Sequence, residues 1–490
     1  MQHGNQPKKN VPSHCKASEV LGHTKARRSD RKTAIIHLSK NQFANRLPDM
    51  NSNIRLRLSI MMFLQLFVWG TWFTTLGLAL SSNEMSDVIG GAYAAVPIAA
   101  IIAPLFLGLI SDRFFNCEKT MGILHLIGGS LLLLAPSLIA EGQGGTLSWI
   151  ITLHMLCYMP TLALSNTVAF SNIDDRNKFP ALRVWGTIGW IAAGLVVGGL
   201  GMSSSPEIFT LGAFSAISLG ILCFFMPKTP PPAKGKPINI GTLLMFDAFK
   251  MLGNPSFLVF IICSALICVP LAYYFAYTAV YLPQIGFQAP ASTMALGQVS
   301  EIFFMLLVPF FFRKLGVKIM ILIGMLAWVA RYMLFAFGAP DQVVWMILLG
   351  VVLHGICYDF FFVTGFMYTD KKAPKEVRSQ AQSLLVFFTQ GVGMFFGYKI
   401  AGAKFEAVKE SSNSLSDAIE SPTFGFWESF GKMFLAEKPN PPGTLAQDAM
   451  NNWKSFWMFP AMMAFVVAGI FLVAFFDKSD AKEDLNHEKN

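Results

Sequence analysis

Long apolar runs, each followed by a short polar stretch, occupy most of the chain beyond residue 50. A helix needs about 20 predominantly apolar residues to cross the hydrocarbon core of a membrane. Runs of this length predict membrane-spanning helices at residues 56–80, 88–110, 119–140, 147–170, 180–201, 207–226, 255–282, 293–312, 317–338, 342–367, 380–402 and 453–476. The pattern therefore predicts an all-α integral membrane protein with 12 transmembrane helices.

The loops between these runs alternate in charge. The connections "SSNEMSD", "AEGQGGT" and "GAPDQ" contain no Lys or Arg, whereas intervening ones such as "DDRNK" and "TDKKAPKEVR" contain several. Loops rich in Lys and Arg stay on the cytoplasmic side of a membrane. The alternation therefore predicts that both termini and the connection 227–254 are cytoplasmic.

The connection 227–254, which begins with "PKTPPPAKGKP", divides the predicted helices into two sets of six. A weak internal repeat supports this division, because "GLISDRFF" (108–115) and "FFFRKLGVK" (310–318) follow the first helix of each set at a similar distance. Two six-helix halves with a substrate site between them are a known transporter plan. We therefore expect an N-terminal half at 50–226, the linker at 227–254, a C-terminal half at 255–478 and a cytoplasmic tail at 479–490.

Two segments depart from this pattern. The external connection 403–452 is long and aromatic around "FGFWESFGKMF". It is interpreted as a surface insertion with short amphipathic helices, and an extracellular lid is the alternative. Residues 1–49 hold ten Lys or Arg and three Asp or Glu, and they lack the apolar core of a secretory signal. They are expected to be disordered, unless Met50 is the true start. Binding of this basic segment to anionic lipids is a further alternative.

The composition agrees with a membrane protein. Hydrophobic residues make up 53% of the 490 residues and charged residues only 14%, whereas soluble proteins carry about 25% charged residues. The seven Cys are scattered without a CxxC motif, so neither a disulfide framework nor a zinc site is expected. HExxH and GxSxG motifs are also absent from the sequence. We therefore expect no enzyme, no metal and no cofactor other than a coupling proton.

Few ionisable residues lie within the predicted helices. A charge at the centre of a membrane helix costs roughly 2.5–3.5 kcal/mol on insertion scales, so each one is a candidate for function. The acidic ones deep inside the spans are Glu301 and Asp359, and the basic ones are Arg183 and Arg331. Lys399 lies near an outer end, where its amine can reach the membrane surface. Both acids could instead form buried ion pairs. Arg183 could be an anchor near the cytoplasmic edge, and Arg331 is interpreted as structural.

Helical spacing groups further polar and aromatic residues with the two acids. Gln298 precedes Glu301 by three positions, and residues three or four apart share a helix face. His354 and Tyr358 share a face in the same way, with Asp359 next to Tyr358. The spacing therefore predicts a cluster of imidazole, phenol and carboxylate near the middle of one helix.

A second group follows from "FPALRVWGTIGW". Arg183, Thr187 and Trp190 lie at positions i, i+4 and i+7, so they form one stripe of a cation, a hydroxyl and an aromatic ring.

Six motifs in order, in six different predicted helices, resemble the nucleoside:proton symporter family of the major facilitator superfamily. They are "FLQLFVWGTWFTTLG", "YMPTLALSNTVAF", "FPALRVWGTIGW", "GQVSEIFF", "AWVARYMLFAFG" and "HGICYDFFFVTG". The resemblance covers the chain from about Met50 to its end, apart from 403–452. It implies the major facilitator fold and proton-coupled nucleoside import across the inner (cytoplasmic) membrane by alternating access. A monomer without a nucleic-acid partner is expected.

The resemblance also implies a substrate site. The family's site positions correspond here to Arg183, Thr187, Gln298, Glu301, Tyr358 and Asp359, with His354 and Trp190 standing where relatives carry other rings. Helix 7 departs more strongly from the family. Ala272 and Phe275 occupy places that are polar in relatives, and Tyr273, Tyr274 and Tyr277 are candidates for replacement hydroxyls.

The motif "GLISDRFF" resembles the superfamily's gating motif and assigns Asp112 and Arg113 to the inner gate. The usual later glycine is replaced by Phe115, so this chain departs from the motif there.

These residues suggest a mechanism. Trp190 and Tyr358 can stack on a base, because aromatic rings favour stacked contacts, while the polar side chains bond its edges and the sugar. Asp359 is expected to carry the proton, with Glu301 as a substrate ligand or a second carrier. The alternative function is a proton-coupled porter of the same fold for sugars or another small polar solute.

Overall fold

The structure is a computed structural model. It describes residues 52–107, 114–173, 179–231, 241, 244–419, 426–432, 435–439 and 444–476. Residues 53–490 form one compact unit and residues 1–52 another. The described part of the larger unit consists of helices, and its only β-pairing is an isolated bridge between Phe287 and Ala436. The predicted head 1–49, the tail 479–490 and the gating residues Asp112 and Arg113 lie outside the described residues.

The N-terminal part of this unit contains eight of the described α-helices. They are α2 (Ser52–Phe73), α3 (Leu76–Ser81), α4 (Ile89–Phe106), α6 (Cys117–Leu132), α7 (Ala135–Ala140), α8 (Gly144–Ser171), α9 (Phe179–Gly199) and α10 (Glu207–Cys223), with the short 3-10 helix η1 (Ser86–Val88) before α4.

The C-terminal part follows a short helical stretch in the linker. Its elements are α12 (Phe246–Phe249), η4 (Lys250–Gly253), α13 (Pro255–Ile285), α14 (Pro290–Gly338), α15 (Val344–Val352), α16 (His354–Tyr358), the π-helix η5 (Asp359–Val363), α17 (Thr364–Lys372), α18 (Arg378–Val386), the π-helix η6 (Phe387–Gly393), α19 (Met394–Ala418), α20 (Phe426–Lys432) and α21 (Leu445–Ala474).

Ten helical stretches of the described chain are long and apolar enough to cross a membrane. Glu207–Cys223 is a shorter apolar helix. Pro290–Gly338 is interrupted at Gly316, whose φ of 68° and ψ of 178° are not helical, so it contains two of the predicted spans. The prediction of an all-α membrane protein is therefore confirmed, and the helices agree with the twelve predicted spans.

The sequence around α13 shows why a span begins and ends where it does. Asn254 caps the helix by accepting a hydrogen bond from the backbone N–H of Phe257 at 3.1 Å, and Pro255 occupies the first turn, where its missing N–H has no consequence. Gly286 follows the last residue with φ of 112°, a conformation that glycine adopts without steric penalty. In the linker just before this cap, a hydrogen bond from Lys250 lowers the pKa of the exposed Asp247 carboxyl.

Several spans are not regular α-helices. The first one is interrupted at Thr74 and Thr75, between α2 and α3. The hydroxyl of Tyr93 bridges this break, because it donates to the carbonyl of Phe73 at 2.7 Å and accepts from the N–H of Gly77 at 3.3 Å. The spans that contain η5 and η6 have π-helical turns, which occur frequently at functional sites.

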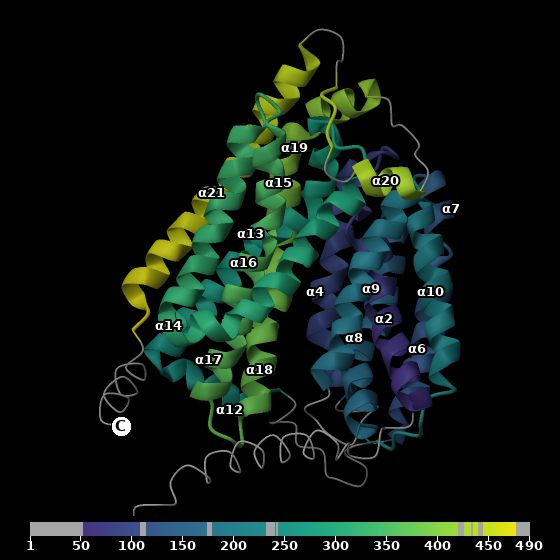
Figure 1. The fold of residues 1–490 in the computed structure, drawn as a ribbon, viewed down its shortest axis with the longest axis vertical. Helices are drawn as coiled ribbons and strands as arrows, with labels where there is room; N and C mark the ends of the chain where they lie inside the picture. Colours follow the sequence, from purple (N-terminus) through teal and green to yellow (C-terminus); the bar gives the residue numbers. More distant parts are fainter. Residues whose placement is uncertain are drawn as a thin grey trace, which may run out of the picture. The chain divides into compact units, whose positions relative to one another are not determined.

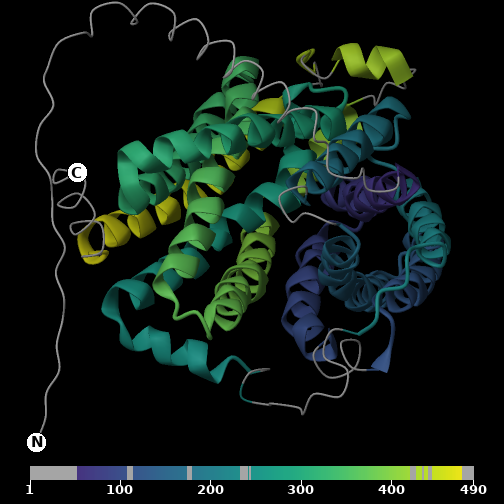
Figure 2. The same ribbon diagram turned by 60° about the horizontal axis from the view of Figure 1, so that its bottom comes forward.

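Helices of the two predicted halves pack largely among themselves. In Figures 1 and 2, α4, α6, α8 and α10 lie on one side, and α13, α14, α19 and α21 on the other. The two groups meet where α4 lies against α19 and η6, where α14 lies against α9, and where α3 lies against α13. Gly194 permits one such approach, since a Cβ there would lie only 3.2 Å from Cβ of Ala295.

The helices on both sides of the predicted insertion 403–452 extend into it. The helix α19 continues to Ala418, and α21 already begins at Leu445. The polar residues beyond 402 continue the helix because its buried face packs on α13, where the side-chain amide of Gln284 donates to the Ser412 hydroxyl at 2.7 Å. A hydropathy window cannot detect such an extension beyond the membrane. Between these helices, α20 lies against α9.

Candidate functional site

The predicted residues of α14 lie against the predicted residues of the tenth span. The hydroxyl of Ser300 donates to the carbonyl of Val352, just before α16. A Cβ on Gly297 would lie 3.1 Å from Cβ of His354, so the two helices are in close contact. Gln298 is buried there, and its Oε1 atom has no hydrogen-bond partner among the described residues. Glu301, one turn further, is half-buried.

Asp359 is completely buried, with 0% of its surface exposed. It is the first residue of the π-helix η5. Neither carboxyl oxygen has a hydrogen-bond partner in the described part of the chain, although Glu301 lies close enough for its charge to act on Asp359. An ionised carboxylate without partners is strongly unfavourable in such surroundings. The local structure therefore does not support the alternative in which Asp359 forms a buried ion pair.

Aromatic rings form a column beside these carboxyl groups, with two stacked pairs and one tilted pair. The ring centroids of Tyr274 and His354 are 5.0 Å apart, those of His354 and Tyr358 are 5.7 Å apart, and those of Tyr358 and Phe362 are 4.7 Å apart. The guanidinium of Arg331 lies 4.2 Å from the centroid of Tyr274, at a distance typical of a cation–π interaction. The column therefore links α13, α14 and the tenth span.

Arg331 has the position expected for a structural residue. It is fully buried, its Nε donates to the carbonyl of Gly350 at 2.9 Å, and Tyr274 covers its guanidinium. These contacts join α14 to α15 and α13.

The predicted stripe of Arg183, Thr187 and Trp190 lies on α9 of the N-terminal half, and this helix packs against α14. Trp190 contacts the rings of Trp69 and Phe73, with centroid distances of 5.3 and 6.1 Å. Arg183 is exposed, and it lies close enough for its charge to act on both Glu301 and Tyr358. Since α9 packs against α14, the cation of one half lies near the carboxyl group of the other half.

The aromatic residues of α13 separate into different surroundings. Tyr273 packs against Phe456 of α21 at 4.9 Å, and Tyr277 packs against Phe405 of α19 at 4.5 Å. Both rings pack among the helices of their own half, and both hydroxyls are buried without a hydrogen-bond partner among the described residues. Their role as replacement hydroxyls remains a prediction. Tyr274 alone of the three tyrosines belongs to the column described above.

Ala272 and Phe275, the two α13 residues predicted to replace polar residues of relatives, also lie in different surroundings. Ala272 is buried beneath α19, since a Cβ on Gly397 would lie 2.7 Å from Cβ of Ala272. Phe275 is half-buried, and its ring lies 5.3 Å from that of Phe73 and 6.0 Å from that of His354.

Sequence reasoning missed a polar network inside the N-terminal half. The side-chain amide of Gln65 donates to the Thr161 hydroxyl at 2.8 Å, and its oxygen lies 3.1 Å from Nε2 of His125. The hydroxyl of Tyr158 donates to the backbone carbonyl of Gln65, and the Tyr158 ring lies 5.6 Å from that of Trp69. His125 is an ionisable residue within a predicted span, so the criterion that selected Glu301 could also have found this network.

A cavity of about 540 Å³ lies at the end of the unit that contains α12. It is bounded by Ile101 and Pro104 of α4, by Phe246 of α12, and by Val386 and Phe387 at the junction of α18 and η6. Among the residues that the structure describes, no group of three His, Cys, Asp or Glu side chains is arranged to hold a metal ion.

Together, two groups of membrane helices with facing polar and aromatic residues define a membrane transporter of the major facilitator fold. The family model described as "Nucleoside H+ symporter" matches residues 52–417. The chain therefore belongs to the nucleoside H+ symporter family, and the resemblance in its motifs is confirmed.

Individual relatives agree with this family. The chain is 38% identical over 440 residues to the transporter YegT of Escherichia coli (strain K12), which covers 86% of this chain and 94% of YegT. It is 30% identical over 383 residues to the nucleoside permease NupG of the same organism, covering 74% of this chain and 90% of NupG.

Solved structures support the fold. The crystal structure of the nucleoside transporter NupG matches with a TM-score of 0.71 and 26% identity, over 87% of this chain and all of that one. A D-xylose-proton symporter matches with a TM-score of 0.58 and 13% identity, over 86% of this chain and 98% of that one. This second likeness shows the fold alone.

Proposed function

We propose that this chain imports nucleosides across the inner membrane by alternating access, driven by the entry of protons. One observation of the site carries the proposal. Helix α9, which carries Arg183 and Trp190, packs against α14, which carries Glu301. The same face of the unit holds the unpartnered Asp359 and the half-buried ring of Tyr358, because α14 also packs against α16 and η5. Membership of the nucleoside H+ symporter family supports the same substrate and coupling ion.

The proposal also includes the oligomeric state, the orientation in the membrane and the inner gate expected from the sequence. The transporter works as a monomer in the bilayer with both termini in the cytoplasm, and it uses no nucleic acid, metal or cofactor besides the proton. Asp112 and Arg113 belong to its inner gate.

The site residues match the two chemical parts of a nucleoside. A base presents flat aromatic faces, on which Trp190 and Tyr358 can stack. The sugar presents hydroxyl groups, which both donate and accept hydrogen bonds. Arg183 can donate to them, Glu301 can accept from them, and Gln298 can do both.

Proton coupling follows from the position of Asp359. In the conformation described here, the carboxyl group is buried without a partner, which favours its neutral form. In the proposed cycle, Asp359 takes up a proton from the outside together with substrate. The halves then close to the outside, as in the conformation described here, and wider opening on the cytoplasmic side hydrates the carboxyl group, which releases the proton.

The two ends of the interface between the halves differ. Near the first loop, α4 contacts α19, and Ser86 donates a hydrogen bond to Asn413 at 3.0 Å. Near α12, the same pair of spans is separated by the apolar cavity. With the proposed orientation, this arrangement corresponds to a transporter closed to the outside. Rocking of one half against the other would close the cavity.

Competition for uptake tests the substrate class. We expect unlabelled uridine, cytidine and adenosine to inhibit the uptake of labelled uridine into cells that produce the chain, because each presents a flat base and a hydroxylated sugar. Glucose, xylose and maltose lack the base and are expected not to inhibit. Cells without the chain provide the background. Inhibition by a sugar but by no nucleoside would favour the alternative solute porter.

A further inference from the structure

Aromatic rings join the two predicted halves of the substrate site in one continuous series. Trp69 lies 5.3 Å from Trp190, Trp190 lies 6.1 Å from Phe73, and Phe73 lies 5.3 Å from Phe275. Phe275 then lies 6.0 Å from His354, with its ring nearly perpendicular to the imidazole at 80°. Trp190 and His354 were both predicted to bind substrate, and the intervening pair, Phe73 and Phe275, was not.

The position of Phe73 is fixed by the break in the first span. It is the last residue of α2, only 3% of its surface is exposed, and the Tyr93 hydroxyl donates to its carbonyl. Since the helix stops directly after Phe73, the pair with Phe275 forms at a defined point between the two halves. The ring of Phe275 is only half-buried, so it retains a face for a ligand.

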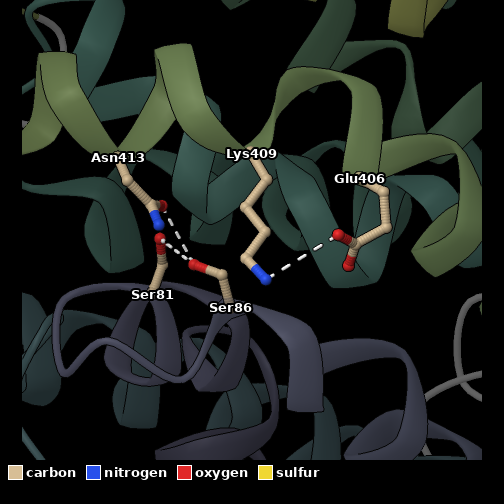
Figure 3. A network of polar contacts seen from close by, with 5 residues as sticks. All are labelled: Ser81, Ser86, Glu406, Lys409 and Asn413. Carbon is tan, nitrogen blue, oxygen red and sulfur yellow. Dashed lines mark hydrogen bonds and ion pairs between the residues drawn. The ribbon is translucent and has the colours of Figure 1, made fainter.

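Further contacts between the halves lie beyond this pair, towards the first loop. Tyr93 stacks on Tyr398 of α19 with their centroids 5.2 Å apart. Figure 3 shows the next layer, in which the Ser86 hydroxyl lies between Ser81 and Asn413 at 3.1 and 3.0 Å. Phe73 and Phe275 are therefore placed between the predicted site residues and the closed end of the interface.

Two neighbouring α13 side chains adjoin His354 and differ in polarity. Tyr274 carries a hydroxyl without a hydrogen-bond partner among the described residues, whereas Phe275 is apolar. Ala272, Tyr273 and Tyr277 pack within the C-terminal half, as described above. Phe275, which adjoins His354, has no polar side-chain atom. A ligand that touches Phe275 therefore meets aromatic carbon, which attracts the face of a ring and cannot hydrogen-bond its polar edge.

We propose that Phe73 and Phe275 contact the substrate as the outer wall of its site, and that this wall recognises the base by shape and stacking without hydrogen bonds to its edge. This inference rests on the proposed transport of nucleosides. It defines the substrate class more closely as ribosides of flat heterocycles whose exocyclic groups can vary. Specificity for the sugar then resides in the polar residues on α9 and α14.

Base analogues test this inference in the wild-type chain. Labelled uridine uptake is measured in competition with uridine, with the riboside of 2-pyrimidinone, which lacks the 4-oxygen, and with ribose, which lacks the base. We expect the 2-pyrimidinone riboside to inhibit within about threefold of uridine, and ribose to be at least ~30-fold weaker, because the base contributes mainly through stacking. A site that hydrogen-bonds the missing group would instead reject the analogue by ~100-fold or more.

Substitution of the wall provides the second measurement. We expect Phe275→Leu to weaken inhibition by uridine and by the 2-pyrimidinone riboside equally, by about tenfold. Phe73→Leu is also expected to weaken inhibition by both compounds. Phe459→Leu is the matched control, since Phe459 contacts Tyr273 away from the site. Unchanged inhibition constants in both wall variants would overturn the inference.

The outcomes also separate this inference from the proposed function. If the wild-type chain takes up uridine but rejects the 2-pyrimidinone riboside strongly, only the inference about the wall fails. If no nucleoside is taken up or inhibits, the proposed function fails with it. The comparison of analogues requires no variant, so poor folding of Phe275→Leu would not prevent the test.

Discussion

The Asp359→Asn variant is expected to lose proton-driven accumulation of uridine while retaining exchange of uridine across the membrane. Asn has nearly the shape of a protonated Asp but cannot release or take up a proton. The variant therefore resembles the proton-loaded carrier, which can still change conformation with substrate. Uptake into proteoliposomes under an imposed pH gradient measures accumulation, and counterflow without a gradient measures exchange.

The control for this variant is Asp341→Asn. It makes the same chemical change at an exposed loop residue away from the site. It should accumulate uridine as the wild type does. If Asp359→Asn still concentrates uridine along a pH gradient, Asp359 is not the proton carrier. The same measurement on Glu301→Gln would then decide whether the second carboxyl group has that role.

Replacement of Arg183 by Met is expected to weaken uridine binding by ~10–100-fold, since hydrogen bonds to charged groups contribute roughly 1.5–3 kcal/mol. Arg183 lies on α9, which packs against α14, and its charge acts on Glu301 of that helix. The variant should therefore raise KM for uridine more than it lowers the maximal rate. Concentration-dependent uptake in proteoliposomes gives both quantities.

A double-variant cycle distinguishes a direct role from a general disturbance. Because Arg183 and Glu301 interact, the combined effect of Arg183→Met and Glu301→Gln should be clearly smaller than the product of the single effects. Lys399→Met is the matched control, since Lys399 is an exposed cation within α19 and should leave KM unchanged. Independent, multiplicative effects of the two site variants would show that the two side chains do not act together.

Much of the fold could be predicted from sequence because membrane insertion depends on local composition. Apolar length identified the spans, and the sequence Asn254–Pro255 with Gly286 marks the start and end of α13. The same approach could not detect that α19 continues to Ala418, because its extension is stabilised by contacts with α13. It also could not detect the break at Thr74 and Thr75, since both residues lie within an apolar run.

For the candidate site, the sequence predicted individual residues but not the contacts between helices. Helical spacing correctly placed His354 and Tyr358 in one stack, and the high energy of buried charge selected Asp359. Spacing cannot decide which helix a face meets, however. Tyr273 and Tyr274 are neighbours in sequence, yet the first packs on α21 and the second contacts Arg331 and His354. The network around His125 likewise depends on three different helices.

Proton movement coupled to nucleoside movement tests the central claim most directly. Proteoliposomes containing the chain and an internal pH dye are exposed to uridine in a buffer one pH unit more acidic than the lumen. Liposomes without the protein are the control. The account predicts that uridine acidifies the lumen and accumulates by up to about tenfold if one proton enters per nucleoside, because one pH unit corresponds to about 1.4 kcal/mol. Uridine entry that neither changes the internal pH nor exceeds the outside concentration would contradict it.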